Sequence, residues 1–112
     1  MGEMIETLQN LMNKFNEKAE KDEEFKNYWK DKERSIQISF IDNQDYSFHL
    51  RDAKLKDLKP EKISNPDIII TTDTETFNAL VEKRMGAMKA YALKKVRIKA
   101  SLEDIMAIRK FL

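Results

Sequence analysis

The spacing of apolar residues changes along this chain, and the change limits the folds that the chain can adopt. Over residues 3–20 apolar side chains recur every three or four positions, which predicts an amphipathic helix. A shorter helix with its aromatic residues on one side is predicted over residues 22–31. From residue 35 to 51 every second residue is apolar, with a polar turn at 42–45, which predicts an antiparallel hairpin with one wet face.

Three further strands are predicted after the hairpin. Ala53 and Leu55 alternate with lysines, which is typical of an edge strand protected from mispairing. The run Ile68-Ile69-Ile70-Thr71-Thr72 is β-branched and apolar on both faces, so we expect both faces to be covered or to line something. Residues 96–100 alternate again and predict the last strand.

Three more helices are predicted in the second half of the chain. Thr72 and Glu75 match a capping box, with Thr72 as N-cap, at the start of a helix that reaches Val81. A short helix is predicted around residues 88–93, and Ser101 is predicted to cap a final helix over residues 102–112. The order of elements predicts an α+β fold: a five-stranded, largely antiparallel sheet covered by helices.

Length and composition indicate a single ordinary domain over residues 1–112, with N-terminal helices over 1–32. The chain contains no cysteine, which removes disulfides and thiol chemistry and fits a reducing compartment. The longest apolar run, residues 68–70, is too short to cross a membrane. The acidic N-terminus is not a signal peptide, and Glu6 stands where N-myristoylation needs Ser or Thr. We therefore expect a soluble cytoplasmic protein.

No combination of residues typical of a catalytic site is visible in the sequence. His49 is the only histidine, and its position on the wet face of a strand favours a solvated side chain. One histidine and scattered carboxylates form no metal-ligand spacing, and two glycines cannot build a phosphate-binding loop. The acids at residues 73, 75, 103 and 104 lie at helix starts, where the helix macrodipole favours them. We expect no enzyme activity, no metal and no cofactor.

Residues 83–99 contain seven basic residues and no acid, although the net charge of the chain is only +1. The segment could face an anionic surface such as phosphate head groups or an acidic partner, or it could be a solvated face without a partner. Tyr91 is its only aromatic residue, whereas nucleic-acid platforms interleave several, so we expect no nucleic-acid partner.

The final helix is apolar around much of its circumference, so we expect it to contact two apolar surfaces at once. One is the sheet, and the other could be a neighbouring helix, a partner chain or a bound ligand. Met85, Met88 and Met106 bring flexible thioethers, which suit adaptable apolar walls and also fill gaps in an ordinary core.

The order of motifs resembles the sterol carrier protein family, type two, over a core of residues 33–112. The resemblance is carried by the stretches 67–73, 76–80, 88–91 and 96–100, and by Leu102, Met106, Ile108 and Lys110. It implies an apolar tunnel between sheet and helices that binds, and could transfer, a lipid without chemistry. Carried over by position, the tunnel-lining residues are Phe77, Leu80, Val81, Met85, Met88, Tyr91, Ile98, Leu102, Ile105, Met106 and Phe111.

The implied ligand is a lipid, a fatty acid, an acyl-CoA or another apolar small molecule. Lys89, Lys94 and Lys95 could hold its carboxylate or phosphate head at the tunnel mouth, and transient contact with a membrane surface is compatible with their charge. An alternative is a non-catalytic module in which the final helix docks on a second copy, as a homodimer, or on an enzyme that handles lipids or acyl-CoA.

Overall fold

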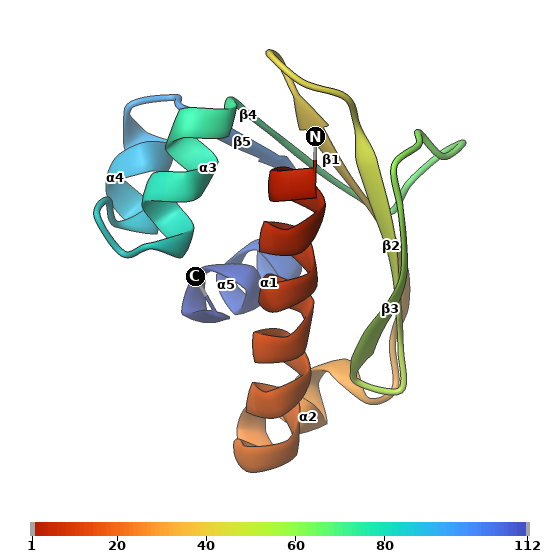
Figure 1. Cartoon of the computed structure of the whole chain (residues 1–112). Coiled ribbons are helices and arrows are strands. Elements are labelled where there is room, and N and C mark those ends of the chain that lie inside the picture. Colours follow the sequence, from red (N-terminus) through yellow and green to blue (C-terminus); the bar gives the residue numbers. More distant parts are fainter. Residues whose placement is uncertain (1, 112) are drawn as a thin grey trace.

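The computed structural model describes residues 2–111, and it confirms the α+β class. All the helices lie over one face of a five-stranded sheet (Figure 1). In chain order the elements are α1 Gly2–Lys21, α2 Glu23–Trp29, β1 Glu33–Phe40, β2 Tyr46–Arg51, β3 Lys54–Lys59, β4 Ile68–Thr72, α3 Thr74–Val81, α4 Ala87–Ala92, β5 Val96–Lys99 and α5 Leu102–Phe111. Leu112, predicted to end the last helix, lies outside the described residues.

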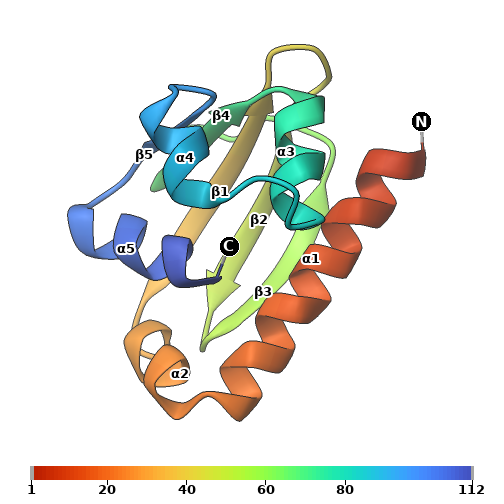
Figure 2. The ribbon, with the colours of Figure 1, turned by 90° about the vertical axis from the view of Figure 1, so that its left-hand side faces the viewer.

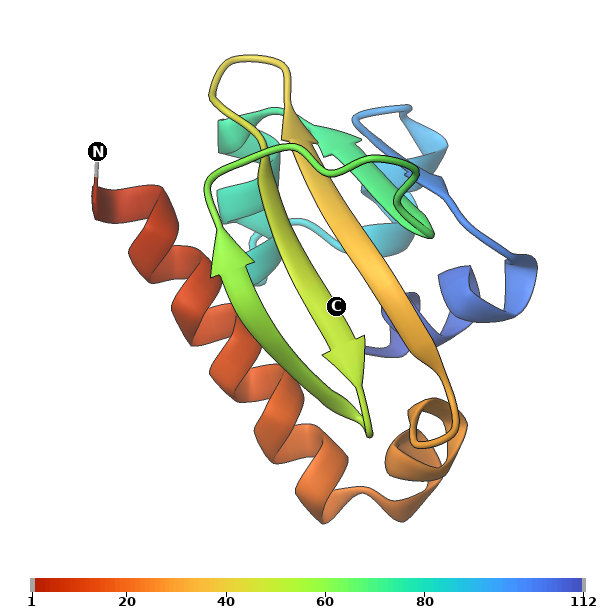
Figure 3. The same ribbon diagram turned by 90° about the vertical axis from the view of Figure 1, so that its right-hand side faces the viewer.

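The strands lie in the order β3-β2-β1-β4-β5, and every neighbouring pair is antiparallel except β1 and β4. The parallel pair requires a crossover between β3 and β4, which residues 60–67 make across the face that carries no helix (Figure 3). The backbone N–H of Ile63 donates to Oε1 of Gln37 at 3.1 Å, and this bond holds the crossover against β1. The sheet is therefore mixed but mostly antiparallel.

Strand alternation places the apolar side chains on the helix-covered face. Ile36 lies opposite Phe48, and Ile38 lies between Tyr46 on one side and Ile70 on the other. The expectation that the apolar strand 68–72 has both faces occupied is met in part. Ile68 is buried on the inner face, whereas Ile69 is half-buried beside the crossover on the outer face.

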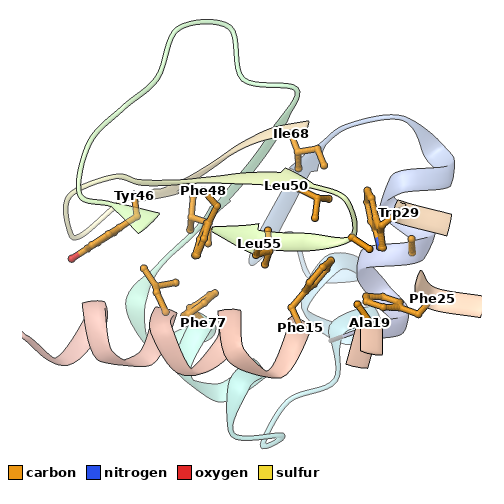
Figure 4. Close-up of a cluster of buried hydrophobic side chains, with 14 of the residues drawn as sticks. Phe15, Ala19, Phe25, Trp29, Tyr46, Phe48, Leu50, Leu55, Ile68 and Phe77 are labelled. Atoms are coloured by element: carbon orange, nitrogen blue, oxygen red, sulfur yellow. The ribbon is translucent and has the colours of Figure 1, made fainter. Parts of the chain in front are cut away.

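Helix α1 packs its apolar stripe on the sheet, where Leu8, Phe15 and Ala19 are buried. Figure 4 shows Phe15 and Ala19 in this cluster. Each such side chain stabilises the fold by about 1.5–3 kcal/mol when it is fully buried, less for alanine. Between these residues Asn16 forms two hydrogen bonds with edge strand β3. Its Oδ1 accepts from the N–H of Leu55 at 2.8 Å, and its Nδ2 donates to the Leu55 carbonyl at 3.1 Å. These bonds occupy part of an edge that would otherwise be open to another strand.

Two local predictions are wrong by about one residue. Ala53 lies in the tight turn before β3, at φ 58° beside Asp52 at φ 55°, and not in the strand. The N-cap of α3 is Asp73, whose side chain accepts from the N–H of Thr76 at 2.7 Å. Thr72 instead belongs to β4 and donates its hydroxyl to the Lys95 carbonyl at 2.9 Å, which ties the start of β5 to the end of β4.

Candidate functional site

Helices α4 and α5 lie over the β4–β5 side of the sheet, and α3 lies between α4 and α1 (Figure 2). Helix α4 is fixed by Ala90, which is fully buried against Leu80 and Val96. Lys94 adopts φ 61° directly after the helix, so the chain can turn back into β5. Ser101 caps α5 as predicted, since its Oγ accepts from the N–H of Asp104 at 3.1 Å.

Asp104 anchors the first turn of α5 to the rest of the domain. Its side chain is only 3% exposed, and it accepts from Nε of Arg34 at 2.8 Å and from the hydroxyl of Tyr28 at 2.5 Å. Burial and then this hydrogen bond raise the pKa of Tyr28 above its usual value, and the hydrogen bond to Asp104 raises the pKa of Arg34. The carboxylate thus joins α2, β1 and α5.

Between α4, β5 and α5 lies a cavity of about 210 Å³, which we name the outer cavity. Its wall is apolar apart from Arg109, the only charged side chain that lines it among the described residues. Its lining residues are Leu80, Ala87, Met88, Tyr91, Val96, Ile98, Leu102, Ile105, Met106, Ile108 and Arg109.

A second, smaller cavity of about 70 Å³ lies deeper, between the sheet and the helices, and we name it the inner cavity. It shares Leu80, Val96 and Ile108 with the outer cavity, so the two are neighbours separated by these side chains. The rest of its lining is Leu11, Phe15, Ile36, Ile38, Phe48, Leu55, Ile70, Phe77 and Phe111, and all of it is apolar.

A groove of about 420 Å³ runs along the opposite side of α5, next to α2. It shares Leu102 and Met106 with the outer cavity, so α5 separates the two hollows. Its rim carries charges of both signs, including Lys110 of α5, which pairs with Glu24 of α2 at 3.8 Å. Several charged side chains line this groove, whereas Arg109 is the only one that lines the outer cavity among the described residues, so the outer cavity is the better match for an apolar guest.

Nine of the eleven residues predicted to line a tunnel border one of these two cavities. Leu80, Met88, Tyr91, Ile98, Leu102, Ile105 and Met106 line the outer cavity, and Phe77 and Phe111 line the inner one. Val81 packs against the main core and Met85 against the Leu80–Ala90–Val96 cluster, so neither borders these two cavities. Whether any of them binds a ligand stays a prediction.

The predicted head-group residues Lys89, Lys94 and Lys95 are exposed and do not line the outer cavity. The cation that does is Arg109, which the sequence analysis did not single out. Its place three residues after Met106 and four after Ile105 puts it on the same side of α5, and helical spacing could have indicated this.

The single histidine of the sequence lies on the outer face of the sheet. His49 lies there, and its Nε2 is 3.0 Å from the Glu33 carboxylate, with both side chains accessible to solvent. Within residues 2–111 no group of three or more metal-ligating side chains gathers. None of the helices described is long and apolar enough to cross a membrane.

A family model described as the SCP-2 sterol transfer family matches residues 8–112, so the match takes in most of α1 as well as the core. Among curated proteins, none matches the chain.

Solved structures match the fold over nearly the whole chain at low sequence identity. A "UbiJ-SCP2 Ubiquinone synthesis protein" is 8% identical with a TM-score of 0.67, and the match covers 99% of this chain and 96% of that one. The palmitated SCP2L2 of Aedes aegypti is 13% identical with a TM-score of 0.62, over 89% of this chain and 88% of that one.

A larger protein contains a similar unit. The sec-alkylsulfatase Pisa1 from Pseudomonas sp. is 15% identical with a TM-score of 0.58, and the match covers 71% of this chain. This chain spans only 13% of the length of the sulfatase. The likeness is one of fold alone.

Proposed function

Because the chain belongs to the SCP-2 sterol transfer family, we propose that it binds a lipid or other apolar small molecule and carries it without chemistry. Family membership supports lipid binding and transfer in general. The apolar outer cavity, open between α4 and α5 and adjacent to the inner cavity, is the observation that carries the proposal for this chain. In this proposal the guest lies in the outer cavity, its far end reaches toward the inner one, and the protein acts in the cytoplasm.

The size of the two cavities favours a slender guest. Together they stay below the roughly 300 Å³ at which small-molecule sites usually begin. A flexible alkyl chain can enter such a space by moving Leu80, Val96 and Ile108, whereas a rigid fused-ring sterol requires a larger displacement. Fatty acids and the acyl part of an acyl-CoA are therefore the guests that the cavities fit best.

Burial of the chain is enough to hold it. Each buried methylene gains about 0.8 kcal/mol, so ~8 methylenes supply about 6 kcal/mol before the entropy of binding is subtracted. Methylene groups are alike, so the free energy of burial depends on the length of the guest's alkyl chain and does not distinguish one alkyl chain of that length from another. Arg109 is the side chain placed to add a charge-assisted hydrogen bond to an anionic head, in the role first assigned to the three lysines.

A tryptophan at Ala87 tests the proposal. Ala87 lines the outer cavity and is only half-buried, so a bulky indole there should fill the space without disturbing the core. We expect Ala87→Trp to weaken the binding of a fluorescent long-chain fatty acid by more than tenfold, since a filled cavity cannot bury the chain. Ala92→Trp, on the exposed side of the same helix, is the matched control and should bind like the wild type. Equal binding by both variants, or none by the wild type, would contradict the proposal.

A second function is favoured by the exposed apolar side chains on α5, of which Leu102 is 73% exposed. Such a surface also suits contact with a second copy or with a lipid-handling enzyme. Native mass spectrometry of the protein as expressed, followed by lipid extraction, separates the two. A monomer with bound lipid supports the carrier, and a dimer without ligand supports the interaction module.

A further inference from the structure

The mouth of the outer cavity is surrounded by exposed apolar side chains from α4 and α5. Met88, Tyr91 and Leu93 come from α4 and its C-cap, and Leu102 and Met106 come from α5. Their exposed fractions run from 44% for Met106 to 73% for Leu102. We name these five residues the apolar rim. They include all but one of the large apolar side chains that are exposed among the described residues, and the exception, Ile41, lies in the β1–β2 turn.

Exposed cations lie on the α4 side of the apolar rim. Lys89 lies on α4, and Lys94 and Lys95 directly follow it. All three side chains are exposed, and none forms an ion pair within the described part of the chain. The nearest acid on α5 at this end, Glu103, lines the groove on the other side of the helix. The rim therefore presents apolar side chains next to a positively charged border on its α4 side.

We propose that the apolar rim docks on a lipid bilayer that contains anionic lipids, with the outer cavity facing the membrane. Apolar side chains that enter the headgroup region, together with lysines that contact anionic headgroups, are the two contributions that hold a peripheral protein at an interface. Four of the five rim residues also line the outer cavity, so the docked mouth opens toward the acyl chains. This inference rests on the proposed function, because docking would let an apolar guest pass between the bilayer and the outer cavity without crossing water.

The positive charge beside the rim favours a bilayer over a second copy of the chain as the docking partner. A twofold contact brings the same patch of both molecules together, so the lysine border of one rim would face that of the other. Like charges opposed across an interface disfavour the contact, whereas anionic headgroups complement them. Helix α1 is not an alternative docking element, because its apolar residues Leu8, Phe15 and Ala19 are already buried against the sheet.

Vesicle binding of charge variants tests the inference. We expect the wild type to sediment with phosphatidylcholine vesicles that contain phosphatidylserine and only weakly with pure phosphatidylcholine. Each lysine near an anionic surface is worth about a fivefold change in partitioning, so the pair Lys89→Gln and Lys95→Gln should lose roughly 30-fold. The matched control, Lys54→Gln with Lys56→Gln, removes the same charge from exposed positions on β3 at the far edge of the sheet. It should bind like the wild type, and high salt should abolish the difference between the two lipid mixtures.

A second pair of variants tests the apolar part of the contact. Leu93 is 53% exposed and does not line the outer cavity, so Leu93→Ser should weaken vesicle binding and leave ligand uptake in solution unchanged. Ile41→Ser removes an apolar side chain that is 75% exposed in the β1–β2 turn, and it should change neither vesicle binding nor ligand uptake.

The outcomes separate docking from ligand binding. Uptake of a fluorescent fatty acid is measured in solution for the same proteins. Vesicle binding with the expected variant pattern supports docking even if the wild type takes up no ligand, a result that would contradict only the proposed function. Docking is overturned if phosphatidylserine adds nothing, or if the β3 control loses as much as the rim variant. It is also overturned if sedimentation shows a dimer that Leu93→Ser dissociates.

Discussion

Asp104 ties the first turn of α5 to α2 and β1. In the sequence it is one of several acids at helix starts, where the macrodipole is a sufficient explanation. In the structure it is buried and bridges Arg34 and Tyr28, which precede it by 70 and 76 residues. Local sequence patterns carry no information about partners so far away, so this bridge could not be predicted.

Replacement of Asp104 by asparagine should destabilise the domain. The amide keeps the shape of the side chain but leaves the partly buried guanidinium of Arg34 without its counter-charge. Breaking such a pair by one partner is costly, and we expect the free energy of unfolding in urea to fall by about 2–4 kcal/mol. Glu103→Gln, on the neighbouring exposed acid, is the control and should stay within about 0.5 kcal/mol of the wild type. An equal effect of both substitutions would show that the bridge contributes nothing.

Asp42 should contribute to stability in a way that depends on pH. Its carboxylate accepts from the N–H of Thr74 at 2.9 Å and from the Thr74 hydroxyl at 2.8 Å, and these bonds hold its pKa below the usual 3.8. The folded chain thus keeps the charge to a lower pH than the unfolded chain does. The stabilisation is complete above 3.8 and is lost as the pH falls through the lower folded value.

We therefore expect the urea midpoint of unfolding to be higher for the wild type than for Asp42→Asn near neutral pH. This gap in midpoint should close below pH 3.8. Asp31→Asn removes an exposed carboxylate that has no hydrogen bond or ion pair within residues 2–111. It should show no gap at either pH. A gap for Asp42→Asn that persists unchanged in acid would contradict this assignment.

At the scale of elements, the periodicity predicted each helix and strand, and the errors lie at the ends of elements. The N-cap of α3 is Asp73, one residue later than predicted, because Thr72 pairs with both neighbouring strands as the last residue of β4. The inward side of α3 is unaffected, since Phe77 and Leu80 are buried. The prediction for α5 was better, because a helix apolar on several sides must contact several surfaces, and α5 borders both cavities and the groove.

Phe111 at the end of α5 should limit the length of the guest. Its ring lines the inner cavity and packs edge-on against Phe15 at a centroid distance of 5.3 Å. In a series of fatty acids we expect affinity to rise about fourfold per methylene until the inner cavity is full. Phe111→Leu should move that plateau to longer chains, as measured by displacement of a fluorescent fatty acid.

The control for this series is Phe25→Leu. Phe25 also packs on Phe15, at 5.0 Å, but lines the groove beside α2 and not the inner cavity. It should lower stability without moving the plateau. If both variants move the plateau equally, or neither does, Phe111 does not set the length.

At the scale of the whole molecule, the number of strands and the mostly antiparallel sheet were predicted, but the neighbours of each strand were not. Alternation reports which side chains face inward and is silent on strand order, so the parallel pairing of β1 with β4 had no local signal. The inner cavity depends on that pairing, since Ile38 and Ile70 lie side by side in its wall. The cavity's residues from α1 and from β1 to β4 were not among the predicted lining residues, because the resemblance carried only residues from Phe77 onward.

The bridge from Asp104 to Arg34 and Tyr28 has a kinetic consequence. Contacts so distant along the chain close large loops, and such closures come late because their entropic penalty must be met before the contact can form. During refolding we therefore expect the sheet and α1 to assemble first, and α5 to settle afterwards. Until α5 packs, the apolar walls of the outer and inner cavities are exposed to water. A lipid that is present during refolding could therefore contact these walls before α5 covers them.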